Sequence, residues 1–426
     1  MIKDPYLVIC KSTNHMLRAA GLIEKQYAHQ LVPVPAEYGY ICNTAIRING
    51  ADVAAIKDML AAKRVAVEGY YRENRRPLPG LLGRLASLAL SENILSIMGK
   101  IEKGMDLQKG ELVTLLAATG QDMEAVFIAA DMLRKELIGD VVDIRAAVEF
   151  SNYCKKNCTY CGLRRDNKTL VRYRMTPGEI IGIAKEMKAM GHHTIILQSG
   201  EDPWYTTDKM LEIIRGIKRE TNMRITLSVG EWSRDEYKLF REAGANNYLL
   251  KIETSNPERF AEIHPDDDYK TRLEHSKWLK ELGYITGSGN IIGLPKQTVE
   301  DIADDIILMK ESGTHMIGLG PFLPAENTPL DREKPGDYDL SLKTIAVARI
   351  YLKNVFIPST TALATLVPEG LQRGLEVGAN TIMYNLTPPQ YRGNYVIYSD
   401  KAVIDLEKTV AAVRAAGRKV PSSLKI

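Results

Sequence analysis

Two different patterns of apolar and polar positions divide the chain. In residues 1–72, short apolar runs alternate with two amphipathic stretches, which predicts a small α+β unit with the element order βαββαβ. Its predicted elements are a strand at 6–10, a helix at 15–26, strands at 29–35 and 43–48, a helix at 51–63 and a strand at 65–71. Residues 73–142 are predicted to form a linker and a helical lead-in, because the basic, proline-containing stretch RENRRPLPG is followed by helical periodicity.

From about residue 143, apolar runs of strand length alternate eight times with amphipathic helical stretches. This alternation predicts an α/β fold with a parallel sheet, and eight repeats predict a closed (βα)8 barrel of the TIM type over 143–400, followed by a helix and tail over 401–426. The predicted strands are 143–150, 194–199, 224–230, 248–253, 283–292, 315–323, 356–363 and 380–386. In such barrels the chemistry lies where strands end and loops begin.

Composition narrows the class of protein without giving a function. The 426 residues are 45% hydrophobic and 26% charged, and the net charge of +3 gives no reason to expect nucleic acid or a membrane as partner. The first residues lack the apolar core of a signal peptide, and no apolar run reaches the length of a membrane span. We therefore expect a cytoplasmic protein with reduced thiols.

Three of the five cysteines crowd into one predicted loop. The segment CKKNCTYCG places Cys154, Cys158 and Cys161 in a C-x3-C-x2-C pattern directly after the first barrel strand. Three thiolates at this spacing can hold three corners of a 4Fe–4S cluster and leave one iron open. Zinc is the alternative, but it would require a fourth ligand nearby, and neither His nor Cys occurs between Cys161 and His192. Three unrelated buried thiols fit the clustering poorly.

The cysteine pattern, with an aromatic residue before its last member, resembles that of the radical S-adenosylmethionine (SAM) superfamily. Further segments resemble successive signatures of the FeFe-hydrogenase active-site maturases, the E component of H-cluster assembly, with biotin synthase and methylornithine synthase as close relatives. These segments are EFSNYCKKNCTYCGLRRDNKTLVRYRMTPGEI, TIILQSGEDP, LSVGEW, YLLKIETSNP, RLEHSKWLKELGY, IIGLPKQTVED, GLGPFLPAENTPL and STTALATLVPEG. The resemblance covers about residues 85–400 and implies an enzyme that reductively cleaves SAM to a 5′-deoxyadenosyl radical.

The resemblance also implies roles for individual residues. Cys154, Cys158 and Cys161 would bind the 4Fe–4S cluster, whose open iron would chelate the amino and carboxyl groups of SAM. Tyr160 would lie beside the adenine, and Arg272 would pair with the methionyl carboxylate. The other positions implied for SAM are Gln198, Ser199, Gly200, Glu201, Ser228, Glu253 (suited to the ribose hydroxyls) and the backbone around Ile292. Taken singly, Glu253 or Arg272 would be read as a solvated surface charge.

For the substrate, the resemblance implies a small molecule, a cysteine-derived iron species, held deeper in the barrel. The positions implied are Thr360, Thr361, Tyr391 and Arg392. Four residues depart from the maturase pattern on this side, namely Lys251 and Ile252 in place of Arg–His, Leu363 in place of Met and Leu386 in place of Trp. A mutase or sulfur-handling enzyme acting on an amino-acid-derived substrate therefore stays open, as does a non-catalytic iron–sulfur carrier.

The N-terminal unit resembles a different family, the small selenium/sulfur (Se/S) carrier-like domains. The segments YLVICKSTNHMLRAAGLI, LVPVPAEYGYICNTAIRI and VAVEGYY carry this resemblance. Cys42 stands where that family places a thiol, so it is a candidate carrier of sulfur or substrate, with core filling as the alternative. Cys10 lies within a predicted strand and is not a candidate.

Charged segments suggest one partner and two structural features. Between Lys155 and Arg174 there are seven Lys and Arg residues and a single acid, Asp166, so this stretch is expected to offset an anionic cluster and to dock an acidic electron donor such as ferredoxin or flavodoxin. Other hydrogenase maturases are further expected partners. The pair His192–His193 is expected to be structural, and the acidic stretch HPDDDY over 264–269 is expected to be a solvated helix entry.

Overall fold

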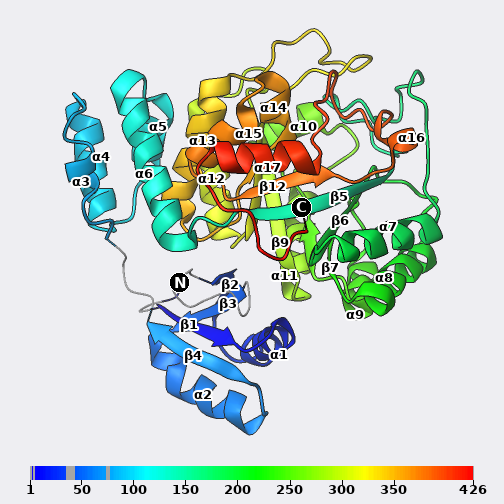
Figure 1. The fold of residues 1–426 in the computed structure, drawn as a ribbon, viewed down its shortest axis with the longest axis horizontal. Helices are drawn as coiled ribbons and strands as arrows, with labels where there is room; N and C mark the ends of the chain where they lie inside the picture. Colours follow the sequence, from blue (N-terminus) through cyan, green and yellow to red (C-terminus); the bar gives the residue numbers. More distant parts are fainter. Residues whose placement is uncertain (1, 3–4, 35–43, 73–76, 426) are drawn as a thin grey trace.

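The computed structural model describes residues 2, 5–34, 44–72 and 77–425. Its first part is a four-stranded antiparallel sheet in the order β2-β3-β1-β4, covered by two helices (Figure 1). The elements are β1 (Pro5–Cys10), α1 (Thr13–Ile23), β2 (His29–Pro33), β3 (Thr44–Asn49), α2 (Val53–Ala62) and β4 (Val67–Arg72). The predicted βαββαβ order is thus what the structure has. Cys42, the candidate carrier thiol, lies outside the described residues.

The main body is an eight-stranded sheet of parallel strands in the order β10-β9-β8-β7-β6-β5-β12-β11. The sheet closes where Met316 and Phe356 form a parallel bridge, with the Ile317 N–H donating to the Phe356 carbonyl at 2.8 Å. Its strands are β5 (Asp143–Ser151), β6 (Thr194–Ser199), β7 (Arg224–Ser228), β8 (Asn247–Leu249), β9 (Ile285–Ile292), β10 (Met316–Pro321), β11 (Pro358–Ser359) and β12 (Thr381–Asn385). The predicted (βα)8 barrel is confirmed.

Most strands end within two residues of the predicted bounds, but two are much shorter than predicted, for identifiable reasons. The predicted strand over 356–363 is reduced to β11, because the Thr360 side chain accepts the Leu363 N–H and starts helix α14 (Thr361–Leu366). The predicted strand over 248–253 ends at Leu249, and beyond it Glu253 adopts φ 63°, a left-handed conformation that a strand cannot contain.

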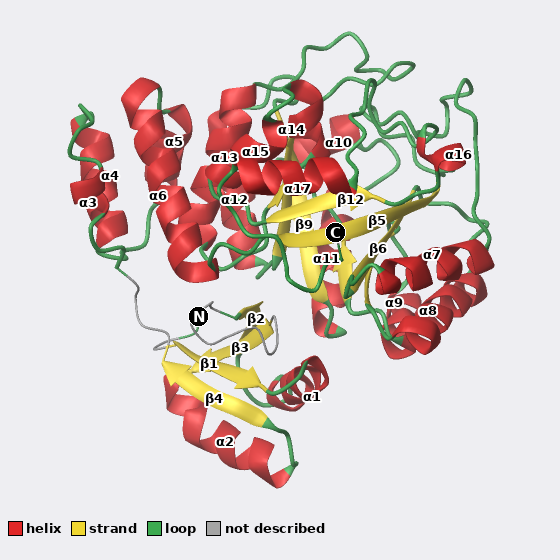
Figure 2. Ribbon diagram, viewed as in Figure 1, coloured by secondary structure: helices red, strands yellow, loops and turns green. Residues whose placement is uncertain are grey.

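Helices surround the barrel, and Figure 2 shows long loops gathered at one end of it and the small sheet beyond the other end. The lead-in helices α5 (Lys109–Ala117) and α6 (Gly120–Ile138) pack against α12 and α13. The remaining helices are α3 (Leu81–Arg84), α4 (Glu92–Glu102), α7 (Pro177–Ala189), α8 (Thr207–Thr221), α9 (Arg234–Ala243), α10 (Pro257–Ile263), α11 (Tyr269–Glu281), α12 (Val299–Glu311), α13 (Tyr338–Leu352), α15 (Gly370–Glu376), α16 (Pro389–Arg392) and α17 (Leu406–Ala415).

Within the described part of the chain, no single helix has the length and apolar composition to cross a membrane, and α5 with α6 would meet that test only as a pair bent by 118°.

The small sheet domain packs against the end of the barrel where the strands begin. Ile285, the first residue of β9, is part of the same apolar cluster as Ile46, Ile56 and Leu60 of the small domain. His315, directly before β10, is buried and lies beside the backbone of Leu31 in β2. The strand ends, where barrel chemistry is expected, therefore lie on the side of the barrel away from this domain.

Candidate active site

A cavity of about 1020 Å³ occupies the barrel, and all eight strands contribute to its lining. It brings together most of the residues that the sequence nominated. These are Cys154, Cys158, Tyr160, Cys161, Gln198, Ser199, Gly200, Glu201, Ser228, Glu253, Arg272, Thr360, Thr361 and Arg392. Since they lie at the ends of six different strands or in the segments that follow those strands, only the closed barrel makes them neighbours.

The loop that carries the three cysteines is fixed by its own polar side chains. Arg172 donates to the carbonyls of Leu163 at 2.9 Å, Arg164 at 2.7 Å and Asn167 at 3.0 Å. Gly162 is needed at its position, because a Cβ there would lie 2.2 Å from the Val396 carbonyl oxygen. The loop is therefore closely packed around the thiols.

The three thiols are half-buried and share an environment that suits a cationic guest. Burial raises the pKa of all three, to about 12 for Cys161, and the neighbouring thiols raise it further for Cys158 and Cys161. Such thiols gain from binding iron, which stabilises them as thiolates. Among the described residues, no three His, Cys, Asp or Glu side chains have the arrangement of ligands around one single metal ion.

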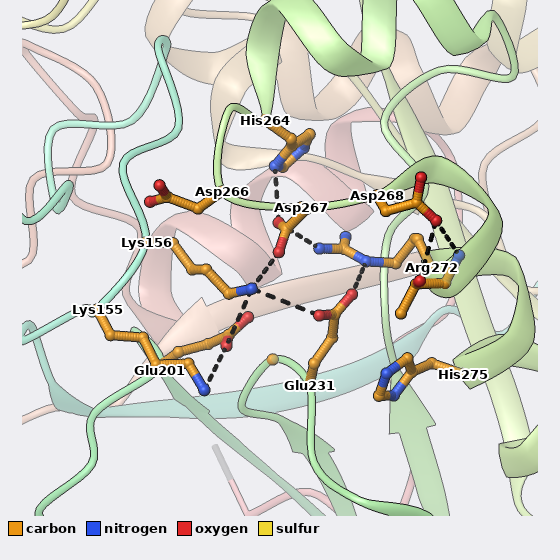
Figure 3. A network of polar contacts seen from close by, with 12 residues as sticks. Lys155, Lys156, Glu201, Glu231, His264, Asp266, Asp267, Asp268, Arg272 and His275 are labelled. Atoms are coloured by element: carbon orange, nitrogen blue, oxygen red, sulfur yellow. Dashed lines mark hydrogen bonds and ion pairs between the residues drawn. The ribbon is translucent and has the colours of Figure 1, made fainter.

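Figure 3 shows a network of ion pairs, and His264 of this network lies 3.3 Å from the Cys158 sulfur. Arg272 on α11 donates from Nε to Glu231 at 2.5 Å and from Nη2 to Asp267 at 2.9 Å. Lys156, from the cysteine loop, pairs with Asp267 and lies 3.4 Å from Glu231 and 4.0 Å from Glu201. With the half-exposed Lys155, whose Nζ lies 3.4 Å from Glu201, three cations thus face three carboxylates.

The pKa values of the network follow from this arrangement. Burial opposes the charge of Arg272, but Glu231 and Asp267 outweigh it and raise the pKa. Burial likewise opposes the charge of Asp267, yet hydrogen bonds from His264 and Lys156 and the charge of Arg272 hold its pKa well below the usual range. Burial raises the pKa of Glu201, with Lys156 and Lys155 partly offsetting it.

An apolar wall with a carboxylate at its edge adjoins this network, since the Tyr160 ring meets the His264 ring edge-on with centroids 5.5 Å apart. Tyr160 packs in a cluster with Ile263, Ile291, Leu294 and Phe322, and its hydroxyl donates to Glu253 at 3.4 Å. Glu253 also pairs with Lys251 Nζ at 2.9 Å. A flat ring system with hydroxyl groups would suit this wall and edge.

The cavity lining also contains polar groups that the sequence did not reveal. Glu149 on β5 is buried and accepts from Asn385 Nδ2 at 2.6 Å, and it pairs with Lys401 from the segment after α16. Thr360, Thr361 and Arg392 are also part of the lining.

Several predicted positions lie elsewhere. Tyr391 is not among the residues that line the cavity. Its hydroxyl instead donates to Glu179 on α7 at 2.8 Å. Ile292 is fully buried in the main core, while its neighbour Ile291 reaches the cavity. Of the residues that depart from the maturase pattern, only Lys251 is part of the lining. The other three, Ile252, Leu363 and Leu386, are not.

The prediction that residues 264–269 form a solvated helix entry is wrong for two of its members. The side chains of His264 and Asp267 are 4% and 2% exposed, and both belong to the network beside the thiols. Asp268 does behave as predicted, since its side chain caps α11 by accepting the Thr271 N–H at 2.8 Å. Glu231, three residues past the end of β7, was missed although its place after a strand end was a usable signal.

Only part of the basic stretch after the cysteines is available to a partner. Lys156 and Arg172 are occupied inside the site, and Arg174 pairs with the buried Asp202 at 2.7 Å. Lys155 and Arg165 are about half exposed, with side-chain exposures of 51% and 50%. His192, as predicted, is structural, because its Nε2 lies 2.6 Å from the Tyr384 hydroxyl.

Comparison with known proteins assigns the family. The profile of the radical SAM superfamily matches residues 148–309, and that of the Se/S carrier protein-like family matches residues 5–72. The FeFe hydrogenase maturase subunit HydE of Thermotoga maritima is 49% identical over 290 residues, which are 68% of this chain and 83% of the relative. The chain belongs to the HydE family.

More distant HydE relatives share the barrel. The 3-methylornithine synthase of Methanosarcina acetivorans is 29% identical over 317 residues, 74% of this chain and 89% of the relative. The crystal structure of methylornithine synthase has a TM-score of 0.69 at 27% identity, covering 76% of this chain and 97% of its own. The FeFe-hydrogenase maturase HydG from Carboxydothermus hydrogenoformans has a TM-score of 0.67 at 26% identity, covering 78% and 81%.

As a HydE-family member the protein is a radical SAM enzyme, and its cofactors are a 4Fe–4S cluster and SAM. The residues present fit these cofactors. Three thiols reach one cavity, and the backbone beside them is kept close by Gly200, where a Cβ would lie 2.2 Å from the Tyr153 carbonyl oxygen. Acidic and basic groups stand next to the thiols, as a zwitterionic ligand requires.

Proposed function

We propose that the protein is a cytoplasmic radical SAM enzyme of FeFe-hydrogenase maturation, acting on a small molecule derived from cysteine and iron. The observation that carries this proposal is the cavity that unites the three thiols with the Arg272 network and the Tyr160–Glu253 wall. Kinship with HydE supports the pathway.

Each side of the cavity has its own task in this proposal. Cys154, Cys158 and Cys161 hold the cluster, which when bound supplies the electron that cleaves SAM to a 5′-deoxyadenosyl radical. Arg272 uses three N–H groups for Glu231, Asp267 and the Lys251 carbonyl, and a guanidinium has five, so two remain for the methionyl carboxylate.

The remaining SAM contacts extend from this anchor. Glu201, with Gln198, Ser199 and Gly200 beside it, faces the methionyl amino group. Tyr160 and the backbone around Ile291 and Ile292 receive the adenine, and Glu253 accepts from the ribose hydroxyls, with Ser228 as a further SAM contact. The SAM site so formed leaves the deeper end of the cavity, with Thr360, Thr361 and Arg392, for the substrate.

Iron content and SAM cleavage test the proposal together. Anaerobically reconstituted protein is expected to bind about four irons per chain, and with dithionite and SAM to release 5′-deoxyadenosine. Replacing all three cluster cysteines by Ala should abolish both. The matched control is Cys10→Ala, since Cys10 is buried in the small domain and remote from the cavity. Unchanged iron in the triple variant would refute the cluster assignment, whereas a full cluster without SAM cleavage would favour an iron–sulfur carrier.

A second candidate is a mutase or sulfur-handling enzyme acting on an amino-acid-derived substrate. It is favoured by the similarity to methylornithine synthase and by the charges of Glu149, Lys401 and Lys251 in the cavity lining, which could receive the carboxylate and ammonium groups of an amino acid. Activation of an apo-hydrogenase by the purified protein together with other maturases would decide for the first candidate, and conversion of a free amino acid for the second.

Partner proteins complete the proposal. The exposed cations Lys155 and Arg165 border the cysteine loop, and they are the part of the basic stretch that can steer an acidic ferredoxin or flavodoxin toward the cluster. Other hydrogenase maturases are the proposed suppliers or recipients of the small molecule. For the N-terminal domain we keep Cys42 as the candidate carrier thiol.

A further inference from the structure

Cys158 differs from the other two cluster cysteines in what lies against its sulfur. The Cys154 sulfur accepts the Glu201 backbone N–H at 3.4 Å, and the Cys161 sulfur lies beside the backbone N–H of Leu163. At Cys158 the neighbour is a side chain, because Nδ1 of His264 lies 3.3 Å from the sulfur. Backbone donors persist whatever the side chain, whereas the contact at Cys158 depends on one residue.

His264 is held in place from several directions. The ring stacks on Phe260 with centroids 4.7 Å apart and meets Tyr160 edge-on at 5.5 Å. Its backbone N–H donates to the Phe260 carbonyl at 2.8 Å, and the adjacent Ile263 carbonyl accepts the Thr159 N–H of the cysteine loop at 3.0 Å. The turn that presents the ring and the loop that presents the sulfur are therefore joined, and the ring cannot turn away freely.

The neighbours of the ring indicate where its proton lies. Nδ1 faces the Cys158 sulfur and, at 3.4 Å, Oδ2 of Asp267, and both of these are acceptors once the thiol is a cluster ligand. Nε2 is buried and has no hydrogen-bond partner among the residues described. A proton on Nδ1 satisfies both acceptors, while a proton on Nε2 would be left without one. Asp267, itself held by Lys156 and Arg272, fixes this tautomer.

We propose that His264 donates a hydrogen bond from Nδ1 to the Cys158 sulfur and thereby raises the reduction potential of the cluster. A donor draws electron density from the thiolate, which stabilises the more negative, reduced state of the cluster. His264 is a positioning residue, since it acts through Cys158. The inference rests on the proposed function, because it takes the three cysteines as the cluster ligands.

Two substitutions separate the hydrogen bond from the packing of the ring. His264→Leu removes the donor and keeps an apolar side chain against Phe260, whereas His264→Asn places an amide N–H close to the position of Nδ1. The measurement is the midpoint potential of the reconstituted full-length protein, by redox titration followed with EPR. We expect the Leu variant to lose about tenfold in the reduction equilibrium, which is about 59 mV for one electron, and the Asn variant to stay near wild type.

The control is His192→Leu, which removes another buried histidine ring at the opposite end of the barrel and should leave the potential unchanged. Should His264→Leu fail to hold a cluster, His264→Gln replaces it, because its amide reaches toward the Nε2 position and should show the same lowered potential. Equal potentials in the Asn and Leu (or Gln) variants, shifted or not, would overturn the proposal. A wild-type protein without any cluster would refute the proposed function instead.

Discussion

Among single residues, the charge balance around Arg272 decides which substitutions are informative about SAM binding. Arg272→Ala would leave Glu231 and Asp267 buried without their main cation, and breaking a buried pair in this way costs about 3–5 kcal/mol of stability. Loss of SAM binding in that variant would not distinguish a lost ligand contact from a damaged site. Glu253 is better suited, because Lys251 is its only ion-pair partner in the described chain.

Glu253→Gln is expected to keep the cluster and to weaken SAM binding. Glutamine tolerates the left-handed backbone as poorly as glutamate does, so the substitution changes the charge alone. Loss of one charge-assisted contact costs roughly 1.5–3 kcal/mol, or about one to two decades in affinity. Equilibrium binding of SAM to the reconstituted protein measures this, with Glu258→Gln, exposed on α10, as the matched control. Wild-type affinity in Glu253→Gln would remove this residue from the SAM site.

The residues that sequence alone could place are those whose chemistry is local. Cys154, Cys158 and Cys161 form a pattern within eight positions, so their spacing predicts their function. Asp267 and His264 gave no such signal, because an acidic stretch before a helix is also what a solvated helix entry looks like. Their burial depends on Lys156 from the cysteine loop and on Arg272 from helix α11, and only the closed barrel brings these charges together.

At the scale of elements, the alternation of strand and helix was sufficient to predict the barrel and nearly every strand. Helix starts were predicted as reliably as strands where the sequence contains a capping motif. At α7, Thr176 and Glu179 form a capping box and Pro177 occupies the first turn. Strand ends were less predictable. Apolar residues still occur after β8 and β11, such as Leu250 and Ile252 or Ala362 and Leu363, but the chain leaves the sheet there to build the site. Hydrophobic periodicity does not show that change.

The close approach of β6 to the cysteine loop gives a prediction at this scale. In Gly200→Ala the new Cβ would lie 2.2 Å from the Tyr153 carbonyl oxygen and 2.8 Å from the Cys154 Cβ, so the loop must move. We expect iron content and SAM cleavage to fall together. Gly182→Ala, in α7 with no atom within 4 Å of the new Cβ, should retain both, since alanine favours a helix by about 1 kcal/mol over glycine. Full iron content in Gly200→Ala would show that the loop has more freedom than its packing indicates.

For the whole molecule, the contact between the small domain and the barrel makes stability depend on pH. Burial lowers the pKa of His315 to about 4, and Lys280 and Arg47 lower it too, while the backbone of Leu31 and Thr286 opposes the shift. The unfolded chain, with an ordinary histidine pKa of 6.5, binds the proton first as pH falls. The free energy of unfolding that depends on His315 staying neutral is therefore fully present above pH 6.5 and is lost as the pH falls toward 4.

Urea unfolding at pH 7.5 and pH 5 measures this contribution. Over the full range it amounts to about 3 kcal/mol, part of which is lost by pH 5. His315→Leu should show a smaller difference between the two pH values than wild type, while the carboxylates titrate alike in both proteins. A control substitution of His193, which is exposed, should leave the difference unchanged. An identical pH dependence in wild type and His315→Leu would contradict the assignment.

The position of the small domain at the far end of the barrel separates its contribution from SAM cleavage. A chain that begins at Pro77 keeps Leu78 and Leu81, which belong to the main core, but exposes Ile285 and His315. We expect such a chain to be less stable and still to release 5′-deoxyadenosine when reconstituted, because no cavity-lining residue is removed.

If the domain delivers sulfur or substrate through Cys42, turnover of the natural substrate should fall in the truncated protein and in full-length Cys42→Ser, but not in Cys10→Ser. Normal turnover in Cys42→Ser would mean that the domain has only a structural role. Loss of SAM cleavage on truncation would show that the end of the barrel where the strands begin also affects the site where the strands end.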